Sequence, residues 1–421
     1  MRAVLCLGIF AAHVALAARF APAIEVVIDY RYDTANFFDA TTANGSKARA
    51  TIEAAADFFS NLITDSLAAI PYTDPNTPGG SNTPVWRQSI THPGTGQTGY
   101  EISSAANASQ DGFNDLPPEY GYSEADEYRD IQIAANQFLI YAGGSSLTVS
   151  GLGGTGVAYY GSETFNNLID QRGKPTGEYS TWGGFVTFDN DGDNNWHYDY
   201  TTNVVPGRID LYSVALHEIG HVLGLNGNSD EWNQYQVGSE WQGPQALAAW
   251  IAQDPNASPT ATGIPTESTL DHHWDNNPPG MPQVDAVQSY VLGTTTLQES
   301  AMDPKITVGE RKLFTYVDAL ALADLGWELN PAMIAPPSDP ADFSGNGTVD
   351  SADLAMWELA YGATAGGDAN GDGLSNGADL LLWQRAYAGQ PSLAPVPEPA
   401  AWVLATIVAI AAGAVRRRAA T

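Results

Sequence analysis

Two histidines and a glutamate lie close together in one short segment, with the residue types and spacing of a metal site. Residues 210–230 read DLYSVALHEIGHVLGLNGNSD and contain His217, Glu218 and His221. On a helix, side chains four residues apart share a face, so both imidazoles are able to reach one ion. Zinc binds histidine nitrogen at about 2.0–2.1 Å, and a catalytic zinc keeps one coordination position for water. Glu218 is then placed to take a proton from the zinc-bound water and pass it to a leaving amine, which is the chemistry of peptide-bond hydrolysis.

A catalytic zinc needs a third protein ligand, and the chain has seven histidines in all. Gly224 lets the chain turn sharply after the helix and return a later residue to the metal. Three histidines lie in an N-terminal apolar run, in a Pro/Gly-rich loop and just ahead of the helix, and suit this role less well: His13, His92 and His197. His272 and His273, in LDHHWDNN, are the better candidates, and Asp230 and Glu231 are acidic alternatives closer in sequence.

The string HEIGHVLG resembles the metzincin metalloproteases. In their compact form the third ligand comes three residues after the glycine, where this chain has Gly227, which has no side chain to offer. His273 followed by Trp274 resembles the displaced third ligand of leishmanolysin-like metzincins, which favours His273 over its neighbour. The methionine turn of the family is matched by SAMDP at residues 300–304, with Met302 under the metal, and Met281 is the competing methionine.

A closing helix is predicted for TYVDALALADLGW, residues 315–327, where Thr315 and Asp318 have the spacing of a capping box. Its Asp-Leu-Gly-Trp ending is similar to matrixin-type metzincins. The resemblance implies an α+β catalytic domain, with a mixed sheet plus an active-site helix. It also implies a zinc metalloendopeptidase that acts on a protein or peptide substrate, with Glu218 activating the zinc-bound water.

The elements that must position these residues are predicted from periodicity. Residues 24–32 alternate as a strand does, residues 46–69 favour a helix, and residues 183–188 favour a strand.

A second set of polar residues repeats near the C-terminus. Residues 342–353 read DFSGNGTVDSAD and residues 368–379 read DANGDGLSNGAD. Calcium needs six to eight oxygen ligands, and each loop supplies side-chain oxygens, one backbone carbonyl and a glycine where the loop must turn. The predicted calcium ligands are Asp342, Ser344, Asn346, Thr348, Asp350 and Asp353 in the first loop, and Asp368, Asn370, Asp372, Leu374, Asn376 and Asp379 in the second.

Both loops end in Asp where an EF-hand has Glu, and each precedes a stretch that favours a helix. Two such loops resemble a type I dockerin. The resemblance implies a small all-α domain that depends on calcium and binds a cohesin-type protein. A calcium-stabilised spacer without a partner is the alternative.

Both ends of the chain have the patterns of addressing segments. Residues 1–17 carry an Arg and an apolar run that ends in Ala-Leu-Ala, as in a secretory signal peptide. Residues 397–399 read Pro-Glu-Pro and precede an uncharged run, 400–415, and three arginines, which resembles the PEP-CTERM sorting signal. This resemblance implies export, transient anchoring in the inner membrane by the C-terminal helix, and release to the cell surface or outside by a sorting enzyme. A permanent anchor is the alternative.

The net charge and the cysteine count exclude several classes of partner and site. Its 421 residues include 17 Lys and Arg against 48 Asp and Glu, a formal net charge of -31. A phosphate backbone would be repelled by this charge, so nucleic acid is excluded as a partner. The single cysteine, Cys6, lies in the segment expected to be removed, which excludes a disulfide scaffold and a thiolate metal site.

The expected order is therefore a signal peptide, a zinc metalloprotease domain, a Pro-rich linker, a dockerin-like calcium module, and a linker with the sorting tail, at residues 1–17, 18–329, 330–341, 342–390 and 391–421. The expected function is that of an exported zinc-dependent endopeptidase tethered through the calcium module. The alternative is a non-catalytic surface or matrix binding protein that uses the protease fold as a scaffold and the dockerin for assembly.

Overall fold

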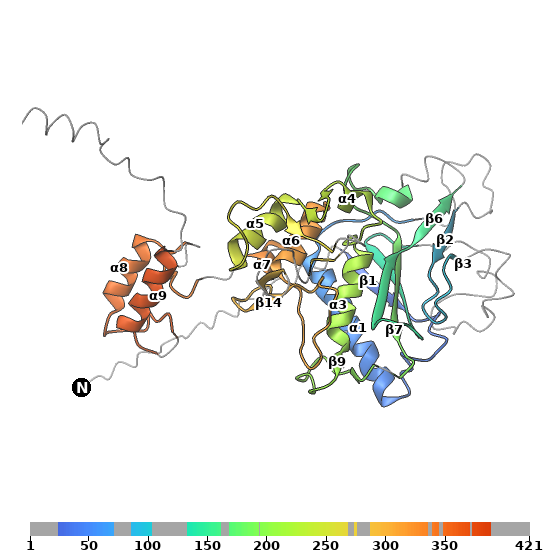
Figure 1. The fold of residues 1–421 in the computed structure, drawn as a ribbon, viewed down its shortest axis with the longest axis horizontal. Coiled ribbons are helices and arrows are strands. Elements are labelled where there is room, and N and C mark those ends of the chain that lie inside the picture. Colours follow the sequence, from blue (N-terminus) through green and yellow to red (C-terminus); the bar gives the residue numbers. More distant parts are fainter. Residues whose placement is uncertain are drawn as a thin grey trace, which may run out of the picture. The chain divides into compact units, whose positions relative to one another are not determined.

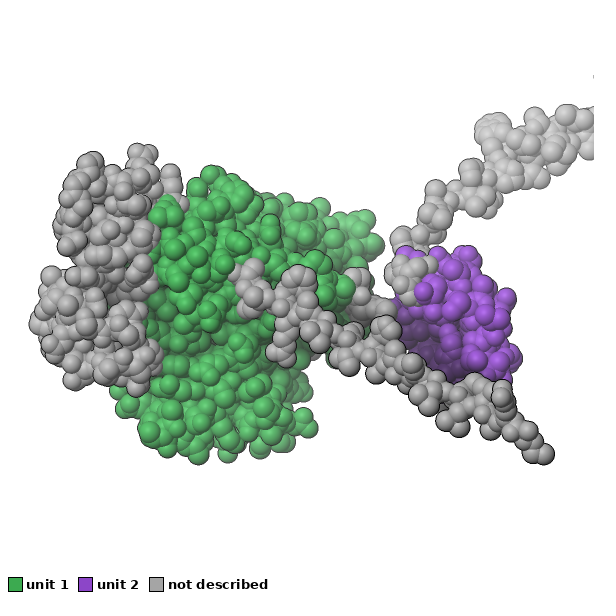
Figure 2. Space-filling view, turned by 180° about the vertical axis from the view of Figure 1, so that it is seen from behind, with its two compact units in different colours: residues 1–335 green, residues 336–421 purple. Residues whose placement is uncertain are grey.

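The computed structural model describes residues 24–70, 86–102, 133–160, 168–192, 194–267, 273–275, 287–335, 339–344, 348–370 and 373–388. The chain divides into two compact units, residues 1–335 and 336–421, coloured separately in Figure 2. The expected signal peptide and sorting tail lie outside the described residues. Within the described ranges, no helix is both long and apolar enough to cross a membrane.

A four-stranded mixed sheet forms the centre of the first unit, in the order β1-β4-β7-β5. Its strands are β1 Glu25–Asp29, β4 Gln137–Ser145, β7 Gly183–Asp189 and β5 Gly151–Thr155. β1, β4 and β7 run parallel, whereas β5 pairs antiparallel with β7 and lies at an edge of this sheet. All residues of β7 are buried, as expected for a strand covered on both faces of its sheet.

Two long helices cover one face of this sheet, as Figure 1 shows: α1, Ala43–Leu62, and α3, Leu211–Val222. α1 begins where the Thr42 hydroxyl accepts a hydrogen bond from the Gly45 amide. The sequence predicted a helix to residue 69, which is wrong: Ile63 is extended and bridges to Leu329, so it leaves the helix. The strand predicted over 183–188 is present as β7. The one predicted over 24–32 is present as β1 but ends at Asp29, and the chain turns at residues 31 and 32.

The opposite face of the sheet supports a second apolar cluster that includes Tyr32, Ile90, Trp182 and Phe185. A three-stranded sheet lies in the same part of the unit, in the order β3-β2-β6. Its strands are β2 Trp86–Ile90, β3 Tyr100–Ile102 and β6 Val157–Tyr160.

Short elements complete the first unit after β7. They are β8 Trp196–His197, β9 Ile209–Asp210, α4 Asp230–Asn233, β10 Gln236–Val237, β11 Glu240–Trp241, α5 Pro244–Gln253, β12 Ile264–Pro265, β13 Gln288–Tyr290, β14 Leu297–Glu299, α6 Tyr316–Asp324 and α7 Pro331–Ile334. α5 packs against α6, and the Asp324 carboxylate of α6 accepts hydrogen bonds from the first amides of α5, those of Gln245 and Ala246.

The start of the expected Pro-rich spacer is structured. α7 lies within residues 330–341, the Asn330 amide donates to the Leu62 carbonyl, and the Tyr316 hydroxyl donates to the Ala335 carbonyl. The first unit accordingly includes residues up to 335.

The second unit contains two helices among its described residues, α8 Ser351–Ala360 and α9 Gly377–Ala388. A small apolar cluster joins them, with Val349 and Trp383 buried and Leu354 and Leu380 packed against these two. The dockerin assignment of this unit stays a prediction.

Candidate metal centre

Three imidazole side chains converge on one point in the first unit. The Nε2 atoms of His217 and His221 are 3.0 Å apart, and each is 3.1 Å from Nε2 of His273. α3 supplies the first two, whereas His273 comes from the segment between β12 and β13. In the part of the chain that the structure describes, this is the one group of three metal-ligating side chains.

Backbone carbonyls orient two of these rings. Nδ1 of His217 lies 2.7 Å from the Ala301 carbonyl oxygen, and Nδ1 of His221 lies 2.7 Å from that of Leu225. A carbonyl only accepts, so Nδ1 carries the proton and Nε2 presents its lone pair to the centre of the group. Lone pairs at this distance repel one another unless a cation lies between them.

The spacing fits one zinc ion. With zinc–nitrogen bonds of about 2.05 Å, neighbouring ligands of a tetrahedral site are about 3.3 Å apart, close to the 3.0 and 3.1 Å observed. The acidic alternatives Asp230 and Glu231 begin α4 and are not part of the group. His272 lies outside the described residues.

Glu218 lies on α3 between the two helical ligands, and β5 covers it. Its carboxylate accepts a hydrogen bond from the Gly153 amide. Burial raises the pKa of Glu218 to about 8, and this hydrogen bond opposes the shift. A cation held by the histidines would lower that pKa again, because opposite charge favours the ionised form.

Glycines in β5 make this close approach possible. A Cβ atom at position 151 would lie 2.6 Å from Oε1 of Glu218, and one at position 153 would lie 2.3 Å from the carbonyl oxygen of the same residue. Both distances are shorter than van der Waals contact, so Gly151 and Gly153 let the strand lie directly on α3. Sequence reasoning missed this role, although the run GLGGT was a visible signal.

Met302 lies under the helix, as the metzincin resemblance implies. The residue is 1% exposed, and a Cβ at Gly220 would lie 2.7 Å from its sulfur. The competing residue, Met281, lies outside the described residues. Gly224 has a φ of +103°, which favours glycine, and the turn it forms precedes the Leu225 carbonyl that orients His221.

Asp318 is a functional candidate whose full role the sequence did not indicate. It forms the predicted capping box with Thr315 at the start of α6. Its fully buried carboxylate also accepts hydrogen bonds from Nε1 of Trp274 at 3.0 Å and from the amides of Ala301 at 2.9 Å and Met302 at 3.3 Å. The Asp318 carboxylate thus binds both Trp274, the neighbour of His273, and the 301–302 segment that lies against α3. These contacts join residues distant in sequence, and only the cap leaves a local signal.

Replacing Asp318 with Asn is expected to destabilise the fold and loosen the histidine group. The amide turns an NH₂ group toward donors that need an acceptor, so the free energy of unfolding should fall by about 2–4 kcal/mol. Zinc affinity should fall about tenfold, since partners behind the ligands set their geometry. Denaturant titration and competition with a chelator measure the two effects.

Asp324→Asn is the matched control, because this buried carboxylate of the same helix caps α5 instead. It should lose stability and keep zinc affinity. Equal zinc affinities in the two variants would contradict the role given to Asp318.

Comparison with known families bears on the same region. A model of the Matrixin family matches residues 165–234, which include α3 with His217, Glu218 and His221. The match supports a metzincin-type zinc metallopeptidase. Comparison with curated proteins gives no match, and neither does comparison with solved structures. A peptidase implies a peptide substrate, and the three converging histidines agree with the zinc that the family uses.

The last aspartate of each predicted calcium loop accepts hydrogen bonds from two equivalent amides. In the first, Asp353 accepts the amide of Ser344 on one carboxylate oxygen and that of Asp350 on the other. In the second, Asp379 accepts the amides of Asn370 and Asn376 in the same way.

Other predicted ligands are placed less completely. The Ser344 hydroxyl donates to Asp342 at 3.3 Å, and Asp368 accepts the Gly373 amide at 2.7 Å. Thr348 and Leu374 are described, whereas Asn346 and Asp372 lie outside the described residues.

Proposed function

We propose that the first unit is an exported zinc-dependent endopeptidase that hydrolyses peptide bonds. The observation that carries this proposal is the convergence of three imidazole nitrogens beside a buried glutamate, Glu218, which shares α3 with two of the three histidines. When bound, zinc supplies Lewis-acid polarisation of a carbonyl group and lowers the pKa of water.

The side chains of the site divide the remaining work. His217, His221 and His273 would hold the metal, and the Ala301 and Leu225 carbonyls orient His217 and His221. The Glu218 carboxylate takes a proton from water and delivers it to the nitrogen of the departing amine. Beside a bound cation the Glu218 carboxylate would be ionised and able to accept that proton, because the positive charge offsets the effect of burial on its pKa.

β5 suits the binding of an extended peptide. It lies at an edge of the described central sheet and contacts α3, which carries Glu218. An edge strand offers backbone donors and acceptors that an extended chain is able to pair with. Binding there would bring a peptide bond close to the metal centre.

Zinc content and chelation test this function. Elemental analysis of the purified chain should give one zinc, and casein cleavage should stop with a chelator and return when zinc is added. A chain that holds zinc and cleaves nothing would favour the alternative function, in which the fold is a binding scaffold.

For the second unit, we propose a calcium-binding module of the dockerin type that tethers the enzyme to a cohesin-type protein. The equivalent bonding of Asp353 and Asp379 in two loops of the same pattern supports this proposal. The oxygen-rich donor set suits calcium rather than a softer metal. We also propose that residues 391–421 hold the chain in the inner membrane until a sorting enzyme releases it to the surface or outside.

Two tryptophans link the loops of this module reciprocally. Nε1 of Trp357, on α8, donates to the Asn376 carbonyl of the second loop at 3.0 Å. Nε1 of Trp383, on α9, donates to the Asp350 carbonyl of the first loop at 3.0 Å. Each helix therefore supports the loop that precedes the other helix.

Replacing Trp383 with Phe is expected to weaken calcium binding by the first loop, although the ring belongs to the second half. Loss of one hydrogen bond costs about 1 kcal/mol, or about fivefold in affinity. Calorimetric titration with calcium measures the change. Tyr387→Phe, at a ring 50% exposed on the same helix, is the control and should bind as the parent does. Parent-like affinity of the first loop in Trp383→Phe would contradict this coupling.

A further inference from the structure

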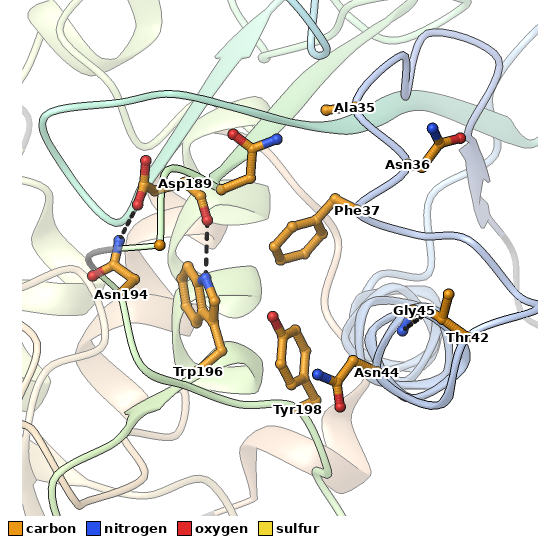
Figure 3. Close-up of a pocket in the computed structure, with 12 residues that line it drawn as sticks. Ala35, Asn36, Phe37, Thr42, Asn44, Gly45, Asp189, Asn194, Trp196 and Tyr198 are labelled. Carbon is orange, nitrogen blue, oxygen red and sulfur yellow. Dashed lines mark hydrogen bonds between the residues drawn. The ribbon is translucent and has the colours of Figure 1, made fainter.

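A pocket of about 280 Å³ lies beside the start of α1, and Figure 3 shows its side chains. The first wall is formed by Ala35, Asn36, Phe37, Thr42, Asn44 and Gly45, and the second by Asp189, Asn190, Gly192, Asn194, Trp196 and Tyr198. None of its lining residues belongs to the metal centre. We propose that this pocket binds one neutral pyranose ring of a carbohydrate.

A part-buried hydrogen-bond network around Asp33 fixes the first wall. The Asp33 carboxylate accepts the amides of Phe37 at 3.1 Å, Phe38 at 2.7 Å and Gly144 at 3.0 Å. These bonds tie the segment before α1 to β4 of the central sheet. Phe37 lines the pocket, and the hydrogen bond from its amide to Asp33 fixes its backbone.

Asp189 fixes the second wall in a similar way. Its carboxylate accepts the Leu147 amide at 2.8 Å and Nδ2 of Asn194 at 2.9 Å, and its carbonyl accepts Nε1 of Trp196 at 2.9 Å. Figure 3 shows the last two bonds at one side of the pocket. Both walls are therefore formed before a ligand arrives, which lowers the cost of ordering them on binding.

The lining combines aromatic rings with amide groups. Phe37 and Tyr198 are half-buried and line the pocket with part of their rings, whereas Trp196 is 3% exposed and packs behind them. The ring centroid of Phe37 lies 6.2 Å from that of Trp196 and 6.0 Å from that of Tyr198. The exposed amides Asn36 and Asn44 stand on the first wall, and Asn190 stands on the second. Aromatic rings accept an apolar face, whereas an amide offers both a donor and an acceptor.

This combination selects the chemistry of the ligand. A pyranose ring has faces of C–H groups and an edge of hydroxyls, and each hydroxyl both donates and accepts. No Lys, Arg or His is among the described lining residues, so an anion lacks a charged partner there. Among the described lining residues the one carboxylate, that of Asp189, already accepts hydrogen bonds on both oxygens. A neutral ligand rich in hydroxyl groups therefore fits best.

The volume sets the size of the ligand. Pockets for drug-sized molecules measure about 300–1,000 Å³, so about 280 Å³ suits a single ring better than an oligomer. The binding energy per atom of such ligands gives a hexose a Kd on the order of 1 mM. The ring would be a free monosaccharide or one residue of a glycan on a protein.

Saturation-transfer NMR on the full chain tests this proposal, with methyl glucoside, methyl galactoside, methyl mannoside and N-acetylglucosamine as probes. At least one probe should bind, and Asn44→Ala and Asn190→Ala should each weaken it by about tenfold. Both side chains are exposed, so the variants keep the fold. Asn203→Ala, at an exposed asparagine outside the pocket, is the matched control and should bind as the parent does.

A second arm distinguishes the two sources of the ring. Binding to ovalbumin before and after enzymatic removal of its glycans should differ if the pocket takes a residue of a protein-linked glycan, and should not differ if it takes only free sugar. The proposal is overturned if no probe binds, or if the pocket variants bind a probe as tightly as Asn203→Ala. It is also overturned if calcium chloride alone titrates the pocket and the sugars do not.

Discussion

The Glu218→Gln chain should bind zinc as the parent does and cleave casein about two to four orders of magnitude more slowly. The amide has the shape of the carboxylate and still accepts a hydrogen bond from Gly153, so the helix and the histidine group should be undisturbed. It is unable to take up a proton, so the step that general base catalysis accelerates is lost. Initial rates of casein hydrolysis and zinc content per chain measure the two quantities.

The matched control for this variant is Glu231→Gln. Glu231 is a glutamate at the start of α4, outside the histidine group, and its replacement should leave the rate unchanged. Parent-like turnover in Glu218→Gln would remove Glu218 from the mechanism. A loss of zinc in the same variant would instead give this residue a structural role.

Replacing His273 with Ala should remove most of the zinc and with it the proteolysis. The variant lacks one of three nitrogens that lie 3.0–3.1 Å apart, so the cost should exceed the 10- to 100-fold that typically follows loss of a partner behind a ligand. Chelator competition gives the zinc affinity, and casein cleavage gives the activity. Calorimetric melting of both metal-free chains shows whether the fold survives.

His272→Ala separates the two adjacent histidines. It should keep both zinc and activity, because the imidazole that meets His217 and His221 is that of His273. The reverse pattern, with zinc lost only in His272→Ala, would exchange the two assignments. Full zinc occupancy in the double variant would require a different third ligand.

The parts of this site that follow from the sequence are those encoded locally. His217, Glu218 and His221 are set by helical spacing, and Gly224 by the need for a positive φ directly after the helix. Thr315 and Asp318 signal their cap three residues apart. Each of these predictions needed only a few consecutive residues.

Other parts depend on contacts that no local pattern records. Spacing alone did not decide the third ligand among His272, His273 and two acidic residues. The reason is that a long segment separates the helix from the two histidines, and its course is not encoded in a local pattern. The run GLGGT is three-fifths glycine, which is depleted in strands, yet it forms β5 because β7 supplies its hydrogen-bond partners. The predicted end of α1 was too late for a similar reason. Ile63 forms a β-bridge with Leu329, which is distant in sequence, and this pairing ends the helix at Leu62.

The glycines of β5 also limit which positions can be mutated to change the specificity of the proposed enzyme. Side chains alternate along a strand, so any residue larger than glycine at 151 or 153 would push the strand off α3. Leu152 points the other way and is 41% exposed. A mutagenesis library aimed at new cleavage preferences should vary this leucine and leave both neighbours untouched.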